Sequence, residues 1–465
     1  MWFAAAVLIC SAVFSPCRVR CADQNPRWFW SAQRTLLESV DCQETAHAVA
    51  QRIAAAKTLV ANLAASEFDK VTADFDLTMR LLLPPAQLRA AWEAMSSAYG
   101  SFQKIIAARA EEKDGYVVIV LTLEFTRGKF DTKVVYKQSG RIAGLFFVPQ
   151  GKYQPPKYVC ADSFDEVEIK VGEGFFPLSG TLSMPKGKGA FPAVVLVHGS
   201  GPNDRDETIG SNKPFRDLAH GLASRGIAVL RYEKRTRQYP LNMLLLNKLT
   251  VKEETIDDAT AATDALAAHD KIDPKRIFVL GHSLGGMLIP RIAAANKKPA
   301  GFISLAGSTR PLEDLILEQV SYLLSLDNPP VEAQQKKIDE LRQQIARVKS
   351  AELSNQTLAS ELPLGIPASY WLDLRDYDPA VAAQKIDKPL LILQGERDYQ
   401  VTMADFARWK SALEAHPRAT CLSYPQLNHL FIAGQGKSSP AEYFTPGNVA
   451  AAVIDDVAAW VQAQR

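Results

Sequence analysis

Between positions 276 and 287 the sequence reads Arg-Ile-Phe-Val-Leu-Gly-His-Ser-Leu-Gly-Gly-Met. The run 276–280 is almost entirely apolar, as a buried parallel strand is, and the apolar residues 287–294 predict a helix after the glycines. Between them stands the pattern Gly-x-Ser-x-Gly, with Ser283 at its centre. Glycines on both sides of a serine remove the Cβ atoms that would block a sharp strand-to-helix turn, and such a turn presents the hydroxyl to a reactant. We therefore predict that Ser283 is a nucleophile.

Strands and helices alternate on both sides of this motif, which is typical of a mostly parallel sheet with helices on both faces. Strands are predicted at 164–171, 176–184, 193–197, 227–232, 276–280, 302–306, 389–394 and 421–424. Thr250 and Glu253 form a capping box that starts a helix ending near residue 269. Helical periodicity fills the long interval between the sixth and seventh strands, so we predict a helical cap at about 311–385.

The first part of the chain, residues 27–150, is organised differently. Helices are predicted at 46–63 and 85–106, and β-branched runs predict strands at 116–125, 133–136 and 142–148. Helices followed by an antiparallel meander indicate a small α+β domain. The polar stretch 150–156, with its Pro-Pro pair, predicts a linker, and the large α/β domain is then expected to span 160–465.

The extreme N-terminus predicts export. Residues 2–14 are apolar over a length that suits a signal peptide and is too short for a stable bilayer-spanning helix. Cys21 and Ala22 provide a plausible cleavage region, so we predict that residues 1–22 are a signal peptide and that the protein is extracytoplasmic, either periplasmic or secreted. A buried N-terminal helix is the alternative. Since the rest of the chain lacks a run of about 18 apolar residues, we expect no stable membrane insertion after signal removal.

Composition narrows the possible partners. The net charge is +2, with acids and bases interspersed. The sequence has no basic stripe of the kind that would indicate nucleic-acid binding, so we expect no nucleic-acid partner. Three of the six cysteines, Cys42, Cys160 and Cys421, lie beyond the predicted signal, and their spacing is not that of metal ligands. We therefore expect no metal and no cofactor. Cys42 and Cys160 could pair in an exported protein, although independent thiols are an equal alternative.

A serine nucleophile needs a base and an acid, which in this kind of fold follow the serine in the order acid, histidine. His429 lies after the last predicted strand, whereas His416 stands in a polar connection. Asp398 lies on the loop after the strand 389–394, where its carboxylate can fix the tautomer of that histidine. We predict the triad Ser283, Asp398 and His429, with Glu396 as the competing acid.

The oxyanion formed during acyl transfer must be met by backbone N–H groups. One comes from Leu284, the residue after the nucleophile, and the other is expected from the loop His-Gly-Ser-Gly-Pro at 198–202. Ser200 is the predicted donor in that loop, with Gly201 next. His198 is expected to hydrogen-bond the loop rather than act as a base. Arg205, further along, could bind a substrate carboxylate, but a local salt bridge is the favoured alternative.

Four motifs together carry a family resemblance. They are 198–202, Gly-His-Ser-Leu-Gly-Gly at 281–286, the loop 395–401 and Asn428-His429. They resemble the bacterial α/β-hydrolases grouped with serine aminopeptidases (S33-like) and dienelactone-hydrolase-like esterases. Over residues 45–150 the chain weakly resembles the NTF2-like domain of unknown function that often precedes such hydrolases. The resemblance implies an α/β-hydrolase fold and hydrolysis of short-chain carboxylic esters, a small-molecule substrate class. Dienelactone hydrolases proper differ, because their nucleophile is a cysteine.

Several points stay open at this stage. A peptidase or amidase using the same triad is the alternative activity, although no acidic cluster for a substrate amino group is evident. The small domain could serve as a lid, a binding module or an oligomerisation module, and an oligomer is possible. Tyr370 and Trp371, in the predicted cap, could line an acyl pocket, but aromatic residues in a helical insertion more often form its core.

Overall fold

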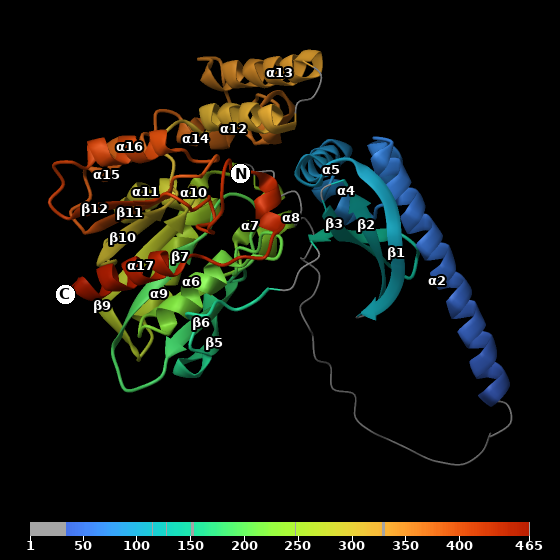
Figure 1. Ribbon diagram of the computed structural model, residues 1–465, viewed down its shortest axis with the longest axis horizontal. Helices are drawn as coiled ribbons and strands as arrows, with labels where there is room; N and C mark the ends of the chain where they lie inside the picture. The colour runs from blue at the N-terminus through green and yellow to red at the C-terminus, as the bar shows by residue number, and fades with distance from the viewer. Residues whose placement is uncertain are drawn as a thin grey trace. The chain divides into compact units, whose positions relative to one another are not determined.

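The computed structural model describes residues 34–113, 115–126, 128–149, 153–246, 248–327 and 331–464 (Figure 1). The chain divides into two compact units, with the boundary after residue 150. The predicted signal segment 1–22 and the side chain of Cys42 lie outside the described residues. Cys160 and Cys421 carry free thiols. No helix in the described part of the chain is both long and apolar enough to cross a membrane.

The small unit consists of helices followed by a four-stranded antiparallel sheet in the order β1-β2-β3-β4. Its elements are α2 (Arg34–Ala64), α3 (Phe68–Ala73), α4 (Leu77–Leu82), α5 (Pro85–Tyr99), β1 (Phe102–Lys113), β2 (Tyr116–Phe125), β3 (Gly128–Tyr136) and β4 (Ile142–Pro149). Aromatic rings fill its core: Trp92 of α5 contacts Phe125 and Phe147 of the sheet at centroid distances of 5.7 and 6.1 Å. The predicted small α+β domain is confirmed in its fold class.

One boundary in this unit was predicted wrongly. The helix predicted to reach residue 106 ends at Tyr99, because Gly100 adopts a φ of 82° that a helix cannot contain. Residues 102–113 instead form β1, which pairs with β2 along its whole length. Its alanine- and glutamate-rich sequence favours a helix locally, and strand pairing overrides that preference.

The large unit is built on an eight-stranded sheet in the order β12-β11-β10-β9-β7-β8-β6-β5. The strands are β5 (Phe164–Val171), β6 (Leu178–Pro185), β7 (Phe191–Val197), β8 (Ala228–Tyr232), β9 (Ile272–His282), β10 (Gly301–Leu305), β11 (Leu390–Gly395) and β12 (Ala419–Tyr424). β5 and β6 form an antiparallel hairpin, β6 joins β8 antiparallel, and the pairs from β8 to β12 are parallel. The α/β class with a mostly parallel sheet is confirmed.

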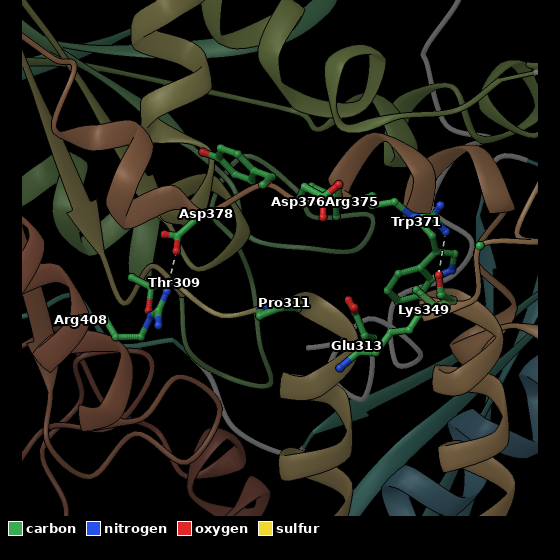
Figure 2. Close-up of a pocket in the computed structure, with 13 residues that line it drawn as sticks. Thr309, Pro311, Glu313, Lys349, Trp371, Arg375, Asp376, Asp378 and Arg408 are labelled. Carbon is green, nitrogen blue, oxygen red and sulfur yellow. Dashed lines mark hydrogen bonds and ion pairs between the residues drawn. The ribbon is translucent and has the colours of Figure 1, made fainter.

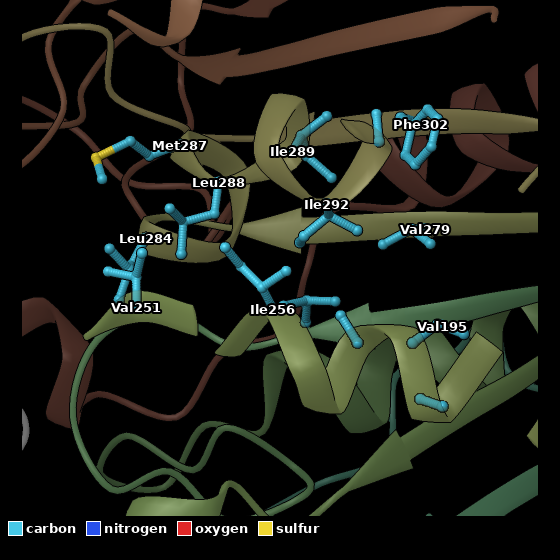
Figure 3. Packing of buried hydrophobic residues seen from close by; sticks show 14 of the residues in the cluster. Val195, Val251, Ile256, Val279, Leu284, Met287, Leu288, Ile289, Ile292 and Phe302 are labelled. Atoms are coloured by element: carbon cyan, nitrogen blue, oxygen red, sulfur yellow. The ribbon is translucent and has the colours of Figure 1, made fainter. Parts of the chain in front are cut away.

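Helices cover both faces of this sheet, because alternate strand residues point to opposite sides. Val194 and Leu196 of β7 pack in a core with α6 (Pro214–Ala223) and α17 (Ala451–Ala463). Their neighbour Val195 packs in a second core with α9 (Asp257–Ala267), α10 (Leu284–Met287), α11 (Ile289–Ala295) and α16 (Met403–Ala412). Figure 3 shows side chains of α10 and α11 directed toward Val251 and Ile256 in this second core.

The segment between β10 and β11 is helical. It contains α12 (Leu312–Asp327), α13 (Val331–Lys349), η4 (Ala359–Glu361), η5 (Pro363–Gly365), α14 (Ala368–Leu374) and α15 (Pro379–Ala383). Figure 1 shows α12 and α13 lying side by side. Short helical turns complete the unit: η2 (Ala161–Ser163), α7 (Arg235–Gln238), α8 (Pro240–Leu244), η3 (Lys252–Ile256) and η6 (Pro440–Phe444). The predicted capping box is present, since Thr250 N–H donates to Glu253 and Thr250 Oγ1 accepts from Lys252 N–H.

Candidate active site

Ser283 stands at a sharp turn between β9 and α10. Its backbone has φ 55° and ψ −114°, a strained combination for a residue with a side chain. The turn requires the glycines around it: a Cβ on Gly281 would lie 2.2 Å from the carbonyl oxygen of Gly285, and a Cβ on Gly285 would lie 2.4 Å from that of Val197. The Ser283 N–H donates to the Leu305 carbonyl oxygen at 2.9 Å, which ties the turn to β10.

The structure brings His429 and Asp398 to this serine. His429 Nε2 is 3.0 Å from Ser283 Oγ, and His429 Nδ1 is 2.6 Å from Asp398 Oδ2. The three residues are only 3–4% exposed. An ionised carboxylate can only accept, so Nδ1 carries the proton and Nε2 is left to accept from the serine hydroxyl. This is the tautomer that a general base requires.

Asp398 is held in place by hydrogen bonds from its own loop. The N–H groups of Gln400 and Val401 donate to Oδ1 at 2.7 and 3.0 Å, and the Gln394 amide donates to Oδ2 at 3.2 Å. The competing acid Glu396 accepts from the hydroxyl of Ser423, away from the histidine. The other late histidine is likewise occupied elsewhere, because the ring of His416 contacts the carbonyl oxygen of Ile386.

Two backbone N–H groups near Ser283 are available to an oxyanion. Among the described residues, neither Ser200 N–H nor Leu284 N–H has an acceptor within the chain. Gly199 is not available, because its N–H donates to Glu207 Oε1 at 2.7 Å. Leu284 is also the first residue of α10, where helix N–H groups point outward and attract negative charge.

The loop that carries Ser200 is fixed by buried polar groups. The Gly199 carbonyl oxygen accepts from Lys234 Nζ at 2.7 Å and from the Asn203 amide at 3.2 Å. His198 hydrogen-bonds the carbonyl oxygen of Asp204 at 3.0 Å, which confirms its predicted structural role. Burial lowers the pKa of His198 to about 4, so the ring stays neutral at physiological pH.

Two partners of this loop were missed by the sequence prediction. Lys234 is 2% exposed and also pairs with Glu254 Oε1 at 2.6 Å, while Glu207 is 1% exposed and contacts His282. A lysine or glutamate in a charged run is usually a solvated surface residue, so the sequence carries no signal for their burial. Only the tertiary structure shows that the side chains of both residues hydrogen-bond the backbone of Gly199.

The three candidate substrate contacts have partners within the protein, as the favoured alternatives for them predict. Arg205 pairs with Glu168 at 2.7 Å and Glu233 at 3.0 Å, so carboxylates of the protein already occupy its guanidinium. Tyr370 is 6% exposed and donates to Glu254 Oε2 at 2.7 Å, and Trp371 is 2% exposed and donates to Ile366. Their polar atoms are satisfied within the protein, as in a packed core.

A cavity of about 580 Å³ lies in the cap region (Figure 2). Its lining includes Thr309, Glu313, Lys349, Trp371, Asp378 and Arg408. None of the triad residues is part of this lining, so the cavity is distinct from the space at Ser283. In the described part of the chain, no group of three or more His, Cys, Asp or Glu side chains could hold a metal ion.

Comparison with known proteins gives two family matches and a close relative. The profile described as "Alpha/beta hydrolase family" matches residues 194–445, and that described as "Protein of unknown function (DUF3887)" matches residues 56–145. Esterase EstD of Thermotoga maritima is 41% identical over 372 residues, which are 80% of this chain and 85% of that protein.

Solved structures are more distant. Est1E from Butyrivibrio proteoclasticus is 15% identical with a TM-score of 0.42, over 64% of this chain and 98% of that one. The Pyrococcus furiosus esterase Pf2001 is 18% identical with a TM-score of 0.39, over 60% of this chain and 91% of that one. At such values these structures carry no information about the substrate.

Proposed function

This chain belongs to the α/β-hydrolase family, and on that basis we propose that it is a serine esterase that cleaves carboxylic esters of small or short-chain acyl groups. The observation that carries the proposal is the hydrogen-bonded chain Ser283–His429–Asp398 at a strained strand-to-helix turn. The relative named as an esterase, matched along most of both chains, favours an ester over the peptide substrate of the alternative.

Each catalytic step follows from the positions of these groups. Ser283 Oγ attacks the ester carbonyl carbon while His429 Nε2 takes the hydroxyl proton, and the carbonyl oxygen becomes an oxyanion facing Ser200 N–H and Leu284 N–H. When the tetrahedral intermediate collapses, the ester C–O bond breaks and His429 returns the proton to the leaving alcohol. Water then attacks the acyl-enzyme with the same base, which releases the carboxylic acid and restores Ser283.

A substrate comparison tests this proposal. We expect turnover of p-nitrophenyl acetate and butyrate, a decrease with longer acyl chains, and kcat/KM at least about 100-fold lower for aminoacyl p-nitroanilides, whose amine leaving group needs protonation by His429. Steady-state kinetics on an acyl-length series with an anilide control measures this. Faster cleavage of the anilide than of every ester would favour the peptidase instead.

The pH dependence follows from the burial of the base. Burial lowers the pKa of His429 below 6.5, although the Asp398 carboxylate opposes this by favouring the protonated ring. Only neutral His429 can accept the Ser283 proton, so activity is lost as pH falls through this lowered pKa. We expect the acid limb of kcat/KM for p-nitrophenyl butyrate to have its inflection below 6.5. A buffered pH series measures it, and an inflection above about 7 would contradict this account.

A further inference from the structure

A buried ion pair lies next to the nucleophile. Glu207 Oε2 is 2.9 Å from His282 Nδ1, and these residues are 1% and 4% exposed. His282 immediately precedes Ser283, while Glu207 comes from the loop that carries Ser200. The ion pair therefore joins the nucleophile turn to the loop that offers the second oxyanion donor.

Hydrogen-bond partners define the protonation of this pair. His282 Nε2 lies 2.9 Å from the carbonyl oxygen of His429, which can only accept, so this nitrogen carries a proton. Burial opposes a charge on His282, but the Glu207 carboxylate outweighs it and raises the pKa of the ring. Burial likewise favours the neutral acid, but the contact with His282 holds the pKa of Glu207 below its ordinary value. The Glu207 carboxylate beside Nδ1 thus favours the protonated form of His282, while Nε2 donates to the His429 carbonyl oxygen.

The other carboxylate oxygen holds the oxyanion loop. Glu207 Oε1 accepts from Gly199 N–H at 2.7 Å, and this fixes the peptide just before the Ser200 donor. Glu207 adopts φ 50°, a left-handed conformation that is uncommon for a residue other than glycine. A Cβ on Gly199 would lie 3.2 Å from the Cβ of Ser283, so this loop packs directly on the nucleophile.

We propose that Glu207 and His282 are positioning residues. They connect the oxyanion loop, the nucleophile turn and the loop of His429, and so determine the position of the Ser200 N–H relative to Ser283. The connection runs from Gly199 N–H through the Glu207 carboxylate and the His282 ring to the His429 carbonyl oxygen. Its role rests on the proposed esterase function. A donor displaced by a fraction of an ångström still allows substrate to bind but stabilises the oxyanion less, because that interaction strengthens only in the transition state.

Two substitutions at one position separate geometry from charge. Glu207→Ala removes both contacts, and we expect kcat to fall about 100-fold while KM changes less than about threefold. Glu207→Gln keeps them, because its amide oxygen can accept from Gly199 N–H and its NH2 can donate to a neutral His282. That variant should retain kcat within about fivefold of wild type, because these two contacts, and not the charge of Glu207, position the donor.

The control is a buried carboxylate that, among the described residues, has no hydrogen bond to a triad residue. Asp217 is 1% exposed and accepts from Val449 N–H at 2.9 Å and from the Tyr153 hydroxyl at 2.7 Å. We expect Asp217→Ala to lower the melting temperature much as Glu207→Ala does, but to keep kcat per folded enzyme within about twofold. Thermal denaturation and kcat are measured on the same preparations, with the folded fraction taken from circular dichroism.

Each outcome decides the proposal. A kcat loss confined to Glu207→Ala and rescued by glutamine supports it. Equal kcat losses in Glu207→Ala and Asp217→Ala, equal losses in Glu207→Ala and Glu207→Gln, or an unchanged kcat in Glu207→Ala would each overturn it. If wild type cleaves no ester, the proposed function fails separately. The rate of Ser283 labelling by a fluorophosphonate then provides the same comparison without a substrate, since the reagent's phosphoryl oxygen also needs the oxyanion donors.

Discussion

Replacing Ser283 by alanine is expected to lower kcat for p-nitrophenyl butyrate by about 10⁴-fold or more. The acyl-enzyme route needs the Oγ nucleophile, and no other described hydroxyl contacts His429 Nε2. The protein should remain folded, because alanine leaves the glycines that permit the turn unchanged. Fluorophosphonate labelling, seen as a mass increase of the intact protein, should disappear together with turnover.

The matched control for this variant is Ser304→Ala. Ser304 is a fully buried serine on the neighbouring strand β10, and its hydroxyl donates to the Gly286 carbonyl oxygen at 3.2 Å. We expect this control to keep both labelling and kcat within about threefold of wild type. Ester turnover by Ser283→Ala at more than about a tenth of the wild-type rate would mean that Ser283 is not the nucleophile.

Replacing Asp398 by asparagine is expected to lower kcat by about 10³- to 10⁴-fold with little change in KM. The carboxylate accepts from His429 Nδ1, whereas an asparagine amide can donate to that nitrogen. The proton of the neutral His429 ring would then be on Nε2, and this nitrogen could no longer accept from the Ser283 hydroxyl. Asparagine still accepts from Gln400 N–H and Val401 N–H, so the loop should keep its conformation.

Glu396→Gln is the control for the acid. Glu396 is the competing acid in the sequence and lies on the same loop as Asp398. Its carboxylate accepts a hydrogen bond from the Ser423 hydroxyl. We expect steady-state kcat to stay within about twofold of wild type in this variant. The reverse result, with Glu396→Gln inactive and Asp398→Asn active, would show that Glu396 is the acid of the triad and Asp398 is not.

Much of the fold and the triad could be predicted because the signals are local or follow a fixed chain order. The turn at Ser283 needs glycines on both sides of the serine, and a buried parallel strand must be continuously apolar. Both features can therefore be predicted from a few consecutive residues. Asp398 and His429 were identifiable because each follows a strand whose end reaches the same edge of the sheet.

The features that the sequence does not determine share one cause, which is contact between distant parts of the chain. Residues 102–113 have helical composition, and only pairing with β2 makes them a strand. Arg205 forms a salt bridge, which was the favoured alternative for it, but its partners Glu168 and Glu233 come from β5 and from the residue after β8 instead of from the neighbouring acidic run. Tyr370 is buried, as the favoured alternative for it predicts, but its hydroxyl partner Glu254 is far away in sequence and is not predictable from it.

By itself, then, the sequence determined the nucleophile turn, the strand alternation and the order of Ser283, Asp398 and His429, because backbone sterics and hydrophobic burial act over a few residues. Only the tertiary structure decided which charges are buried together. The strand order places Glu207, His282 and the His429 carbonyl oxygen within hydrogen-bond reach around Ser283. A buried charge is tolerated only beside its partner, and which partner that is depends on how the loops meet in space.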